Sequence, residues 1–541
     1  MSSIQSRDEV LSHLDDPWDV LVIGGGITGA GIAREATRAG LRVLLVEQRD
    51  FAWGTSSRSS KLVHGGLRYL REGLLRLVWE SVRERERLLR DAPGLVDPLP
   101  FILANYTADE HGRLAFGLAL AVYDLIAGTW KHQYANAEQI AGILPGISRE
   151  GLAGGFRYYD ASTDDARLVV RVLREAAASG ACALNHTAVT GLVREEGRVV
   201  GVRAVDGPTG GEREIRARVV VNATGVWVDR LRAEVGGERR MRPLRGSHLI
   251  FAAARFPVKE ALALQHPADR RVMFVFPWQG VTVVGTTDLD HREDLGVEPG
   301  ISGAEVAYLM TAVEARFPEL HLTLDDVVSS YSGVRPVVST GKADPSAETR
   351  DHVVWDEEGL ITVTGGKLTT FRIIAHDAME TVVKHLGDGT VIHHPDQVLD
   401  PLPAEVAGLE SLPEEDRLWL LGRHAAETAA LLAIAQPGDL EHVGDTSFLW
   451  VELRWAARSE WVVHLDDLLL RRVRVGLLVA EGGRALLPRV REVCAAELGW
   501  DDARWAQEEV DYLALWARCY SLPDRATIPE WRVGHQDRAE A

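Results

Sequence analysis

The feature that most constrains the fold of this chain is a glycine-rich turn near its start, Gly24–Gly29, which contains the spacing G-x-G-x-x-G. The turn follows a β-branched run at Val20–Ile23, which is typical of a buried parallel strand. A stretch of helical composition, Gly29–Arg38, comes next, and a second apolar run, Arg42–Val46, ends at Glu47. This strand–turn–helix–strand unit predicts a doubly wound nucleotide-binding domain.

Each residue of this unit has a physical role in holding a dinucleotide. Gly24 permits the tight turn, Gly26 lets the backbone approach a pyrophosphate, and Gly29 lets helix and strand pack closely. The helix N-terminus offers N–H groups and the positive end of a dipole to the phosphates. The Glu47 carboxylate can accept hydrogen bonds from ribose hydroxyls. We therefore expect these four residues to bind a dinucleotide cofactor.

Two later segments favour FAD as that cofactor. Val219–Gly225 is an apolar strand that ends in Ala-Thr-Gly, and Leu360–Thr370 reads as a strand, a double glycine and a helix start. A helix N-terminus at the second segment would face the flavin pyrimidine edge and stabilise the anionic reduced ring. The cofactor contacts expected here are Gly225, Gly366, Lys367 and Leu368.

The length of 541 residues exceeds what one hydrophobic core usually holds, so we expect two or more domains. Further strands are expected at Arg198–Val205, Val219–Ala223, Val272–Phe276, Val281–Gly285 and Leu360–Thr364, and helices at Asp165–Ala178 and Leu368–Leu386. The alternation predicts an α/β fold over residues 17–399, in which a doubly wound, Rossmann-like FAD-binding domain carries an inserted, mostly antiparallel β-sheet substrate domain.

The two ends of the chain differ from this pattern. Residues 1–16 are expected to form a polar tail without the apolar core of a signal peptide. From about residue 400 the stretches Glu405–Ala435 and Phe448–Glu481 show helical spacing and few strand signals. Residues 400–541 are therefore predicted to form an α-helical C-terminal domain.

Composition excludes several classes of function. A net charge of −19 repels phosphodiester backbones, so we expect no nucleic-acid partner. The only cysteines, Cys182, Cys494 and Cys519, lie far apart without metal-ligand spacing, which argues against a disulfide framework or a metal site and fits a reducing cytoplasm. The longest apolar stretch, Leu114–Trp130, is short for a membrane span and contains Asp124. It is expected to be a buried helix or a surface that rests on a membrane.

Several motifs occur in an order that resembles one known family. They are Thr55–Leu70 (TSSRSSKLVHGGLRYL), Gly246–His248, Gly285–Asp288, Tyr331–Pro336 and Gly365–Thr370. Together they resemble the respiratory, aerobic FAD-dependent glycerol-3-phosphate dehydrogenases. The resemblance runs from about Trp18 into the C-terminal domain, at Glu460-Trp461, Asp466-Asp467 and Arg471-Arg472, with a departure at Tyr158–Asp165.

The resemblance implies that sn-glycerol 3-phosphate is oxidised to dihydroxyacetone phosphate with FAD as the hydride acceptor. It adds Thr55, Ser56 and Ser57 to the expected cofactor contacts. For the substrate phosphate it nominates Arg68, Arg335 and Arg350, because the planar guanidinium pairs with phosphate oxygens bidentately.

For the base that removes the hydroxyl proton, His64 is favoured and His248 is the second candidate. His64 precedes Gly65-Gly66, which would let backbone, flavin and substrate approach closely. Lys367 is expected to stabilise the developing alkoxide or the reduced flavin.

The resemblance further implies that electrons pass to a membrane quinone. We therefore expect a cytoplasmic enzyme, a homodimer being compatible with the sequence, that attaches peripherally to the inner face of the cell membrane. Leu114–Trp130, flanked by Arg113 and Lys131, and the arginine-rich helix around Arg471 are the candidate surfaces. Three alternatives stay open: a glycerol-3-phosphate oxidase that uses oxygen and releases peroxide, a flavin oxidase acting on an amine or amino acid, and a flavin-binding scaffold without activity.

Overall fold

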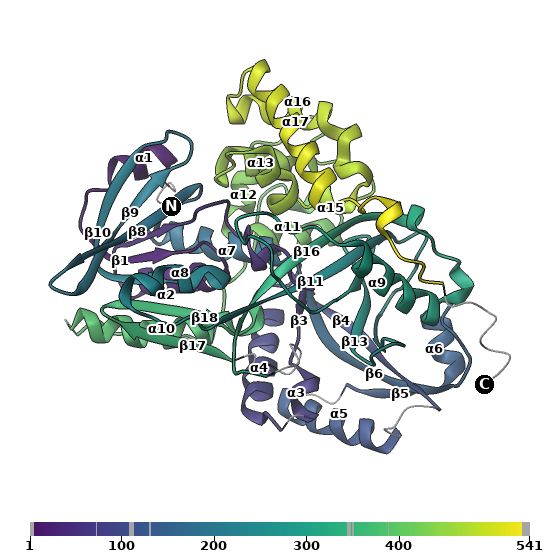
Figure 1. Cartoon of the computed structure of the whole chain (residues 1–541). Coiled ribbons are helices and arrows are strands. Elements are labelled where there is room, and N and C mark those ends of the chain that lie inside the picture. The colour runs from purple at the N-terminus through teal and green to yellow at the C-terminus, as the bar shows by residue number, and fades with distance from the viewer. Residues whose placement is uncertain are drawn as a thin grey trace.

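The computed structural model describes residues 5–71, 73–107, 113–128, 131–342, 348, 351–387 and 389–532. Two β-sheets lie beside each other, and the C-terminal helices, in yellow and light green, cover the junction between them (Figure 1). This arrangement is the predicted fold class: a nucleotide-binding α/β unit, a mostly antiparallel second sheet and a helical C-terminal domain.

The first sheet is built on the central strand β1 (Trp18–Ile23), which lies parallel between β2 (Val43–Val46) and β10 (Glu212–Asn222). Strand β7 (Cys182–Leu184) extends the sheet beside β2, and β18 (Leu360–Gly365) extends it beside β10, both in parallel. Strand β17 (His352–Glu357) is antiparallel at one edge. The carboxyl ends of five parallel strands therefore meet at one edge of the sheet.

Three helices cover one face of this sheet. They are α2 (Ile27–Arg38), α7 (Asp165–Ala178) and α10 (Phe371–Leu386), and they share a buried apolar core with the strands. The opposite face packs on the antiparallel strands β8 (Thr187–Glu195) and β9 (Arg198–Asp206). The helix predicted at Asp165–Ala178 is confirmed to the residue, and the one predicted from Leu368 begins as a single 3₁₀ turn, Leu368–Thr370.

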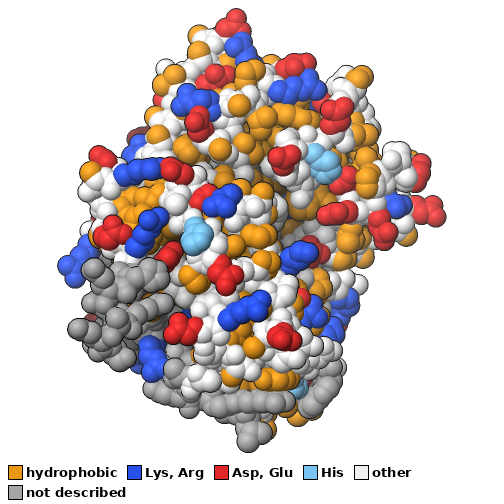
Figure 2. All heavy atoms as spheres, turned by 90° about the vertical axis from the view of Figure 1, so that its right-hand side faces the viewer, with side chains coloured by type: hydrophobic (Ala, Val, Ile, Leu, Met, Phe, Trp, Pro, Cys, Tyr) orange, Lys and Arg blue, Asp and Glu red, His pale blue; other side chains and the backbone are white. Residues whose placement is uncertain are grey.

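The second sheet is antiparallel except where β12 runs parallel to β4. Its strands are β3 (Leu62–Val63), β4 (Val96–Tyr106), β5 (Gln133–Ala135), β6 (Leu152–Thr163), β11 (Met241–Ala252), β12 (Ala261–Gln265), β13 (Val272–Trp278), β14 (Val281–Gly285), β15 (Leu289–Asp290) and β16 (Val327–Val338). Helices α6 (Ala137–Ile143) and α9 (Gly303–Arg316) lie toward one side of the molecule. Figure 2 views that side and shows charged side chains of both signs interspersed among hydrophobic patches.

Three helices lie together below the second sheet in Figure 1: α3 (Leu67–Arg71), α4 (Leu75–Asp91) and α5 (Arg113–Ala127). Most of the apolar stretch Leu114–Trp130 thus lies in helix α5, and residues 129 and 130 are outside the described part. Leu120 and Tyr123 of α5 are buried, while Leu118 and Leu125 are 70% and 75% exposed. Within the described residues, no helix has both the length and the apolar character needed to cross a membrane.

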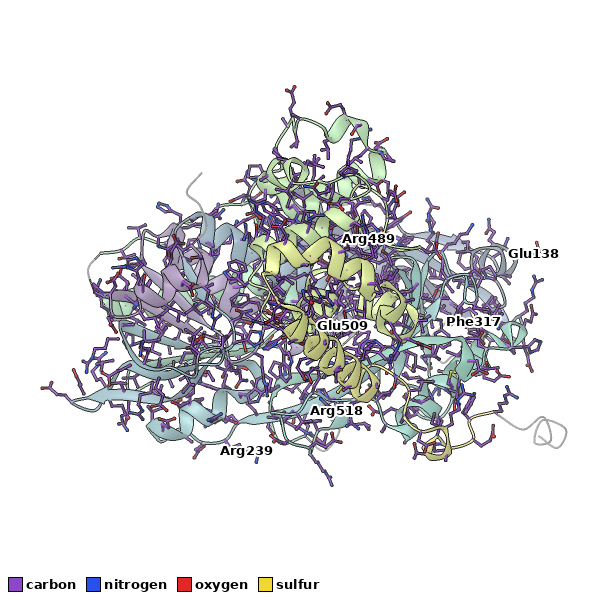
Figure 3. The ribbon with its side chains drawn as sticks, turned by 90° about the horizontal axis from the view of Figure 1, so that it is seen from above. Glu138, Arg239, Phe317, Arg489, Glu509 and Arg518 are labelled. Carbon is purple, nitrogen blue, oxygen red and sulfur yellow. The ribbon has the colours of Figure 1, made fainter. Side chains whose placement is uncertain are left out.

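The C-terminal domain is helical as predicted, but its helices are shorter than the sequence periodicity suggested. They are α11 (Glu414–His424), α12 (Thr428–Ala433), α13 (Trp450–Ser459), α14 (Leu465–Asp467), a π-helical turn (Leu468–Arg472), α15 (Val475–Leu478), α16 (Leu487–Leu498) and α17 (Asp502–Cys519). Seen from above, α16 and α17 carry the labelled Arg489, Glu509 and Arg518 over the middle of the molecule (Figure 3).

The arginine-rich segment of this domain is buried rather than exposed. Arg471, Arg472 and Arg474 are each 1% exposed, and Asp50, just beyond β2, accepts hydrogen bonds from Arg471 and from both terminal nitrogens of Arg472. A solvated or membrane-facing role for this helix is therefore wrong. The physical reason is that buried carboxylates of the nucleotide-binding domain supply the counter-charges that a buried guanidinium needs.

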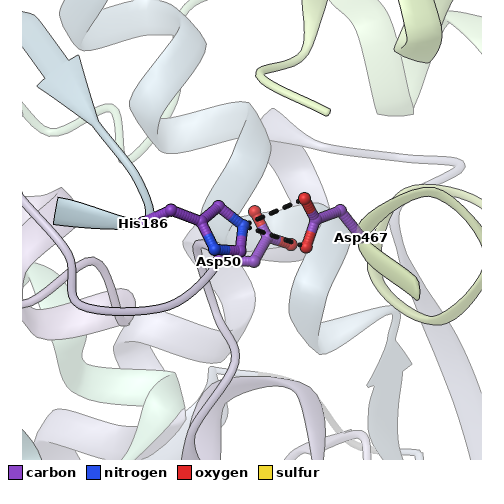
Figure 4. A group of neighbouring side chains, drawn as sticks. All are labelled: Asp50, His186 and Asp467. Carbon is purple, nitrogen blue, oxygen red and sulfur yellow. Dashed lines mark hydrogen bonds and ion pairs between the residues drawn. The ribbon is translucent and has the colours of Figure 1, made fainter. Parts of the chain in front are cut away.

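Beside these arginines, Asp50, His186 and Asp467 approach one another closely, with 3.0 Å between His186 Nε2 and Asp467 Oδ2 (Figure 4). Arg471 also donates to Asp467, at 2.7 Å. Because arginine side chains already neutralise both carboxylates, this cluster serves as an ionic connection between the two domains.

The start of the chain is more ordered than the predicted tail. Residues Arg7–Ser12 form helix α1, whose capping box joins Ser6 and Glu9. Val10 is buried against the first sheet, and Arg7 donates hydrogen bonds to Asn185 and Asp206. The prediction of a polar tail over residues 1–16 is therefore wrong for the helix, because long-range contacts that local polarity does not reveal hold it in place.

Candidate active site

A cavity opens at the carboxyl ends of β1, β2, β10 and β18, where ligands bind in doubly wound folds. It contains about 1270 Å³ of space not filled by protein atoms, including space open to solvent. The predicted cofactor residues that line it are Gly24, Gly26, Glu47, Thr55, Ser56, Gly225, Gly366, Lys367 and Leu368. Segments from five parts of the chain are thus brought to one cavity.

Gly24 and Gly29 have packing roles that only glycine can fill. Gly24 has φ +111°, and a Cβ on it would lie 2.5 Å from the carbonyl oxygen of Ala223. A Cβ on Gly29 would lie 1.9 Å from the carbonyl oxygen of Gly24. Gly29 therefore lies behind the cavity wall and lets α2 approach β1, which is the close packing expected of it.

The N-terminus of α2 faces the cavity. Gly26 is its N-cap residue and supplies no side-chain cap, while Ile27 N–H donates to Ser56 Oγ at 3.1 Å. Gly26, Ile27 and Thr28 all line the cavity. A helix terminus of this kind binds phosphate groups through its N–H groups and its dipole, so the residues fit the pyrophosphate of a dinucleotide.

Glu47 is held rigidly at the end of β2. Its two carboxylate oxygens accept hydrogen bonds from Gly25 N–H at 2.7 Å and Arg49 N–H at 2.9 Å. Burial raises the pKa of this carboxyl, and the two backbone N–H groups act in the opposite direction. The side chain reaches the cavity wall, where each oxygen keeps a second lone pair for a ligand hydroxyl.

The predicted residues Thr55 and Ser57 connect the nucleotide-binding unit to the second sheet and to the C-terminal domain. Thr55 Oγ1 donates to the carbonyl oxygen of Val334 in β16 at 2.6 Å. The carbonyl oxygen of Ser57 accepts hydrogen bonds from Lys61 and from Arg474. Ser57 is buried behind the cavity and is not among the residues that line it.

His248 lies in β11 beside the same motif segment. Its Nε2 is 3.0 Å from Ser60 Oγ, and its ring stacks on Tyr331 at 4.4 Å between centroids. Burial, and then the charges of Arg335 and Lys61, lower the pKa of His248 well below its usual range. The imidazole is therefore neutral at physiological pH and is a weak proton acceptor.

Arg335 has an anionic partner within the protein. It donates to Asp288 Oδ1 at 2.9 Å and to Thr286 Oγ1 at 3.2 Å, and about a quarter of its side chain is exposed. Gly246 permits this approach, because a Cβ there would lie 2.5 Å from Arg335 Nη2. The motifs Gly246–His248, Gly285–Asp288 and Tyr331–Pro336 therefore meet in adjacent strands.

The turn between β3 and α3 carries His64 and passes beside Lys367. His64 is half-buried in that turn, and a Cβ on Gly66 would lie 3.3 Å from Lys367 Nζ. Lys367 Nζ also donates to Ser81 Oγ at 3.0 Å and lies 3.9 Å from the centre of the Tyr69 ring. The side chain of Arg68 and all of Arg350 lie outside the described residues.

Sequence reasoning missed the aromatic and apolar part of the cavity wall. Trp53 and Trp227 line it with ring centroids 6.0 Å apart, and Pro336 and Leu231 contribute further surface. Their positions in the sequence could have indicated these tryptophans, because Trp53 precedes the motif at Thr55 and Trp227 follows Gly225. Tryptophan suits such a wall because its flat ring buries a large apolar area.

Residues 19–377 match the family model described as FAD dependent oxidoreductase, and residues 389–505 match the C-terminal domain of alpha-glycerophosphate oxidase. The chain is 36% identical over 521 residues to the glycerol-3-phosphate dehydrogenase 2 of Mycobacterium tuberculosis, covering 92% of this chain and 88% of the relative. It is 38% identical over 507 residues to the glycerol-3-phosphate dehydrogenase of Mycobacterium leprae, covering 90% and 86% of the two chains.

Among solved structures, the glycerol-3-phosphate dehydrogenase of Bacillus halodurans complexed with FAD matches with a TM-score of 0.75 at 28% identity, covering 96% of this chain and 98% of that one. L-alpha-glycerophosphate oxidase of Mycoplasma pneumoniae has a TM-score of 0.56 at 17% identity, covering 72% and 100%, and shares the fold. FAD is therefore the cofactor of this chain. Since motif residues from three segments line the cavity at the carboxyl ends of the parallel strands, and since the relatives are matched over most of their length, this chain belongs to the family of FAD-dependent glycerol-3-phosphate dehydrogenases.

Proposed function

We propose that this enzyme oxidises sn-glycerol 3-phosphate to dihydroxyacetone phosphate by hydride transfer to FAD and passes the electrons to a quinone. The observation that carries the proposal is that three of the motif segments, Thr55–Leu70, Tyr331–Pro336 and Gly365–Thr370, contribute Ser59, Pro336 and Lys367 to the wall of one cavity. Relatives that carry the name glycerol-3-phosphate dehydrogenase support the choice of substrate.

When bound, FAD accepts a hydride from C2 of the alcohol at its N5 atom. The chain must then supply a base for the hydroxyl proton. We assign that role to His64, because it is half-buried in the turn beside Lys367, whereas His248 has a strongly lowered pKa. Lys367 stabilises negative charge that develops on the substrate oxygen or the reduced cofactor.

The phosphate of the substrate needs cations, and we assign Arg335, together with Arg68 and Arg350, to it. Asp288 holds the Arg335 guanidinium at a fixed position while part of it stays exposed. Such a pair pre-orients the guanidinium, so less side-chain entropy is lost when a phosphate binds.

The test is an anaerobic titration of the purified holoenzyme with sn-glycerol 3-phosphate. We expect bleaching of the oxidised flavin spectrum, with one equivalent of dihydroxyacetone phosphate formed per flavin. Glycerol and an α-amino acid serve as controls, since neither carries the phosphate dianion. A flavin that stays oxidised with glycerol 3-phosphate but bleaches with the amino acid would support the amine or amino-acid oxidase instead.

The electron acceptor distinguishes the proposed function from an oxidase. We expect reduced enzyme to be reoxidised faster by a short-chain quinone than by dissolved oxygen. Stoichiometric peroxide formation with slow quinone reduction would favour the oxidase, whose C-terminal domain model this chain also matches.

The proposed quinone partner requires contact with the membrane, and the outer face of α5 is the surface that we assign to it. Leu118, Val122 and Leu125 repeat at helical spacing on this face and are exposed. The neighbouring helix α4 exposes Leu75 and Trp79. Basic side chains that lie near these helices are those of Arg76, Arg83 and Lys131, all exposed. Such a surface suits peripheral attachment to the inner leaflet.

A further inference from the structure

The turn that carries His64 is attached to a buried carboxylate that the assigned chemistry does not use. Gly65 N–H donates to Asp160 Oδ1 at 3.1 Å. The same oxygen accepts hydrogen bonds from Tyr123 Oη at 2.6 Å and from Arg85 Nη1 at 2.5 Å. The backbone of the turn after β3 is thus linked, through one carboxylate oxygen of β6, to side chains of α4 and α5.

All members of this group are shielded from water. Tyr123, Arg85 and Asp160 are 1%, 3% and 4% exposed. Burial and the adjacent carboxylate raise the pKa of Tyr123 well above its usual range, so the phenol keeps its proton and donates it. In such surroundings each hydrogen bond has a well-defined geometry, and losing one leaves an unsatisfied buried group.

Steric contacts leave the turn little room to move. A Cβ on Gly65 would lie 2.2 Å from Tyr123 Oη and 2.5 Å from a methyl group of Val82. On the other side of the turn, Gly66 lies against Lys367 Nζ and the Tyr69 ring. The backbone next to His64 is therefore enclosed between the Asp160 group and Lys367.

We propose that Asp160, held by Tyr123 and Arg85, is a positioning residue that fixes the His64–Gly66 turn against Lys367 for proton removal. The inference rests on the proposed function, because it needs His64 or Lys367 to take part in oxidation of the alcohol. The inference also explains why the buried arginine, carboxylate and phenol are present, since removing such charged groups from water costs free energy. A displacement of the turn by about 1 Å would lower the rate of a proton transfer markedly.

The experiment measures the rate constant of anaerobic flavin reduction at saturating sn-glycerol 3-phosphate by stopped flow. We expect Asp160→Asn to lower the rate constant by about tenfold or more, and Tyr123→Phe by about threefold, with FAD content unchanged. The amplitude of the absorbance change reports the active fraction, so a variant that is merely less stable loses amplitude and keeps its rate constant.

Tyr158→Phe is the matched control, because Tyr158 is buried beside Tyr123, with ring centroids 6.3 Å apart, and its change removes one phenol hydroxyl from the same core. We expect its rate constant to stay within about twofold of wild type. If Asp160→Asn does not fold, the rate constant of Tyr123→Phe tests the inference, because this variant keeps the aromatic ring and its packing.

Wild-type reduction rate constants in both Asp160→Asn and Tyr123→Phe would overturn the inference. Equal losses in Tyr158→Phe and Tyr123→Phe would also overturn it, because core packing would then explain the effect. Failure of the proposed function has a different signature, since the wild-type flavin itself would not be reduced by glycerol 3-phosphate.

Discussion

At the scale of single residues, the cavity is shaped by positions where no side chain fits. Gly29 packs against Gly24 so closely that even a methyl group has no space. The contact between Gly29 and Gly24 sets where α2 begins, and it therefore also sets the position of Gly26 at the cavity. Overpacking at such a point usually costs about 1–3 kcal/mol and moves the backbone.

We expect Gly29→Ala to reduce the amount of FAD that co-purifies with the protein, because the turn must move away from the helix. The measurement is flavin released per chain on denaturation. Gly142→Ala is the control, since Gly142 lies in α6 with no atom within 4 Å of an added Cβ. A fully loaded Gly29→Ala protein would contradict the packing role.

Arg335→Ala should mainly impair productive binding of the substrate. We expect kcat/KM for glycerol 3-phosphate to fall by more than about tenfold, equivalent to roughly 1.4 kcal/mol, with FAD content retained. Arg271, 3.6 Å from Asp288, still partly neutralises that carboxylate in the variant. Arg292→Ala is the control, because Arg292 is an exposed arginine close to Asp288 in the chain. A fall in kcat/KM smaller than tenfold would show that Arg335 does not bind the substrate phosphate.

His64→Ala should slow anaerobic flavin reduction by roughly 10²-fold or more, because a general base is lost while the flavin stays bound. The rate constant is measured by stopped flow, with His393→Ala as a control at an exposed histidine. An unchanged rate would transfer the role to His248 or Lys367.

At the scale of elements, helix α7 is joined to the C-terminal domain by charge. Asp164 is the N-cap residue of α7 and accepts a hydrogen bond from Arg167 N–H at 3.2 Å. It also accepts one from Arg423 of α11 at 2.8 Å. Glu460, just after α13, pairs with Arg167 at 2.7 Å. Helix α7 and the C-terminal helices therefore share buried ion pairs.

These pairs predict loss of stability in acid. Burial opposes ionisation of Asp164, but Arg423 and Arg474 outweigh it and lower the pKa from 3.8 to about 2. The pKa of Glu460 is lowered from 4.5 to about 2 in the same way, chiefly by the charge of Arg167. A lowered folded-state pKa stabilises the protein above the unfolded pKa, and this stability is lost as pH falls toward the folded pKa. The relevant window is about pH 4.5 to 2.

We expect the free energy of unfolding to fall through that window by on the order of 2 kcal/mol for each carboxylate. Urea unfolding at a series of pH values from 5 to 2 measures it. Asp164→Asn should be less stable at pH 7 and should depend less on pH than wild type. Asp502→Asn, at a carboxylate that is 97% exposed, is the control. Parallel pH profiles for wild type and Asp164→Asn would contradict the assignment.

At the scale of the whole molecule, a net charge of −19 repels anionic lipid, so the proposed attachment to a membrane has to be local and largely apolar. The face of α5 meets that requirement, while the buried arginines around Arg471 do not. Burying a leucine in an apolar phase contributes about 1.5–3 kcal/mol.

We therefore expect Leu118→Ser combined with Leu125→Ser to weaken binding to lipid vesicles by tenfold or more. Vesicle flotation measures the bound fraction, and high salt should have a modest effect because apolar burial dominates. Val510→Ser is the matched control, since Val510 is an exposed apolar side chain of α17, 62% exposed. Equal binding of the double variant and wild type would exclude this face.

The sequence by itself determined the features that local chemistry specifies. The glycine spacing at Gly24–Gly29, the β-branched runs and the helix at Asp165–Ala178 follow from periodicity and turn chemistry within a few residues. The ordered motifs also determined the family, and the residues expected to bind the cofactor do line one cavity for the most part.

Only the tertiary structure decided which charged side chains are buried and what they contact. Arg471 and Arg472 look like a solvated helix face until Asp50, more than 400 positions earlier, is placed beside them. In the same way Asp160 acquires its place under the His64 turn only when β6, α4 and α5 meet. The physical reason is that burial of a charge is favourable only with its partner present, and a partner that is distant in the chain leaves no local pattern around the residue it neutralises.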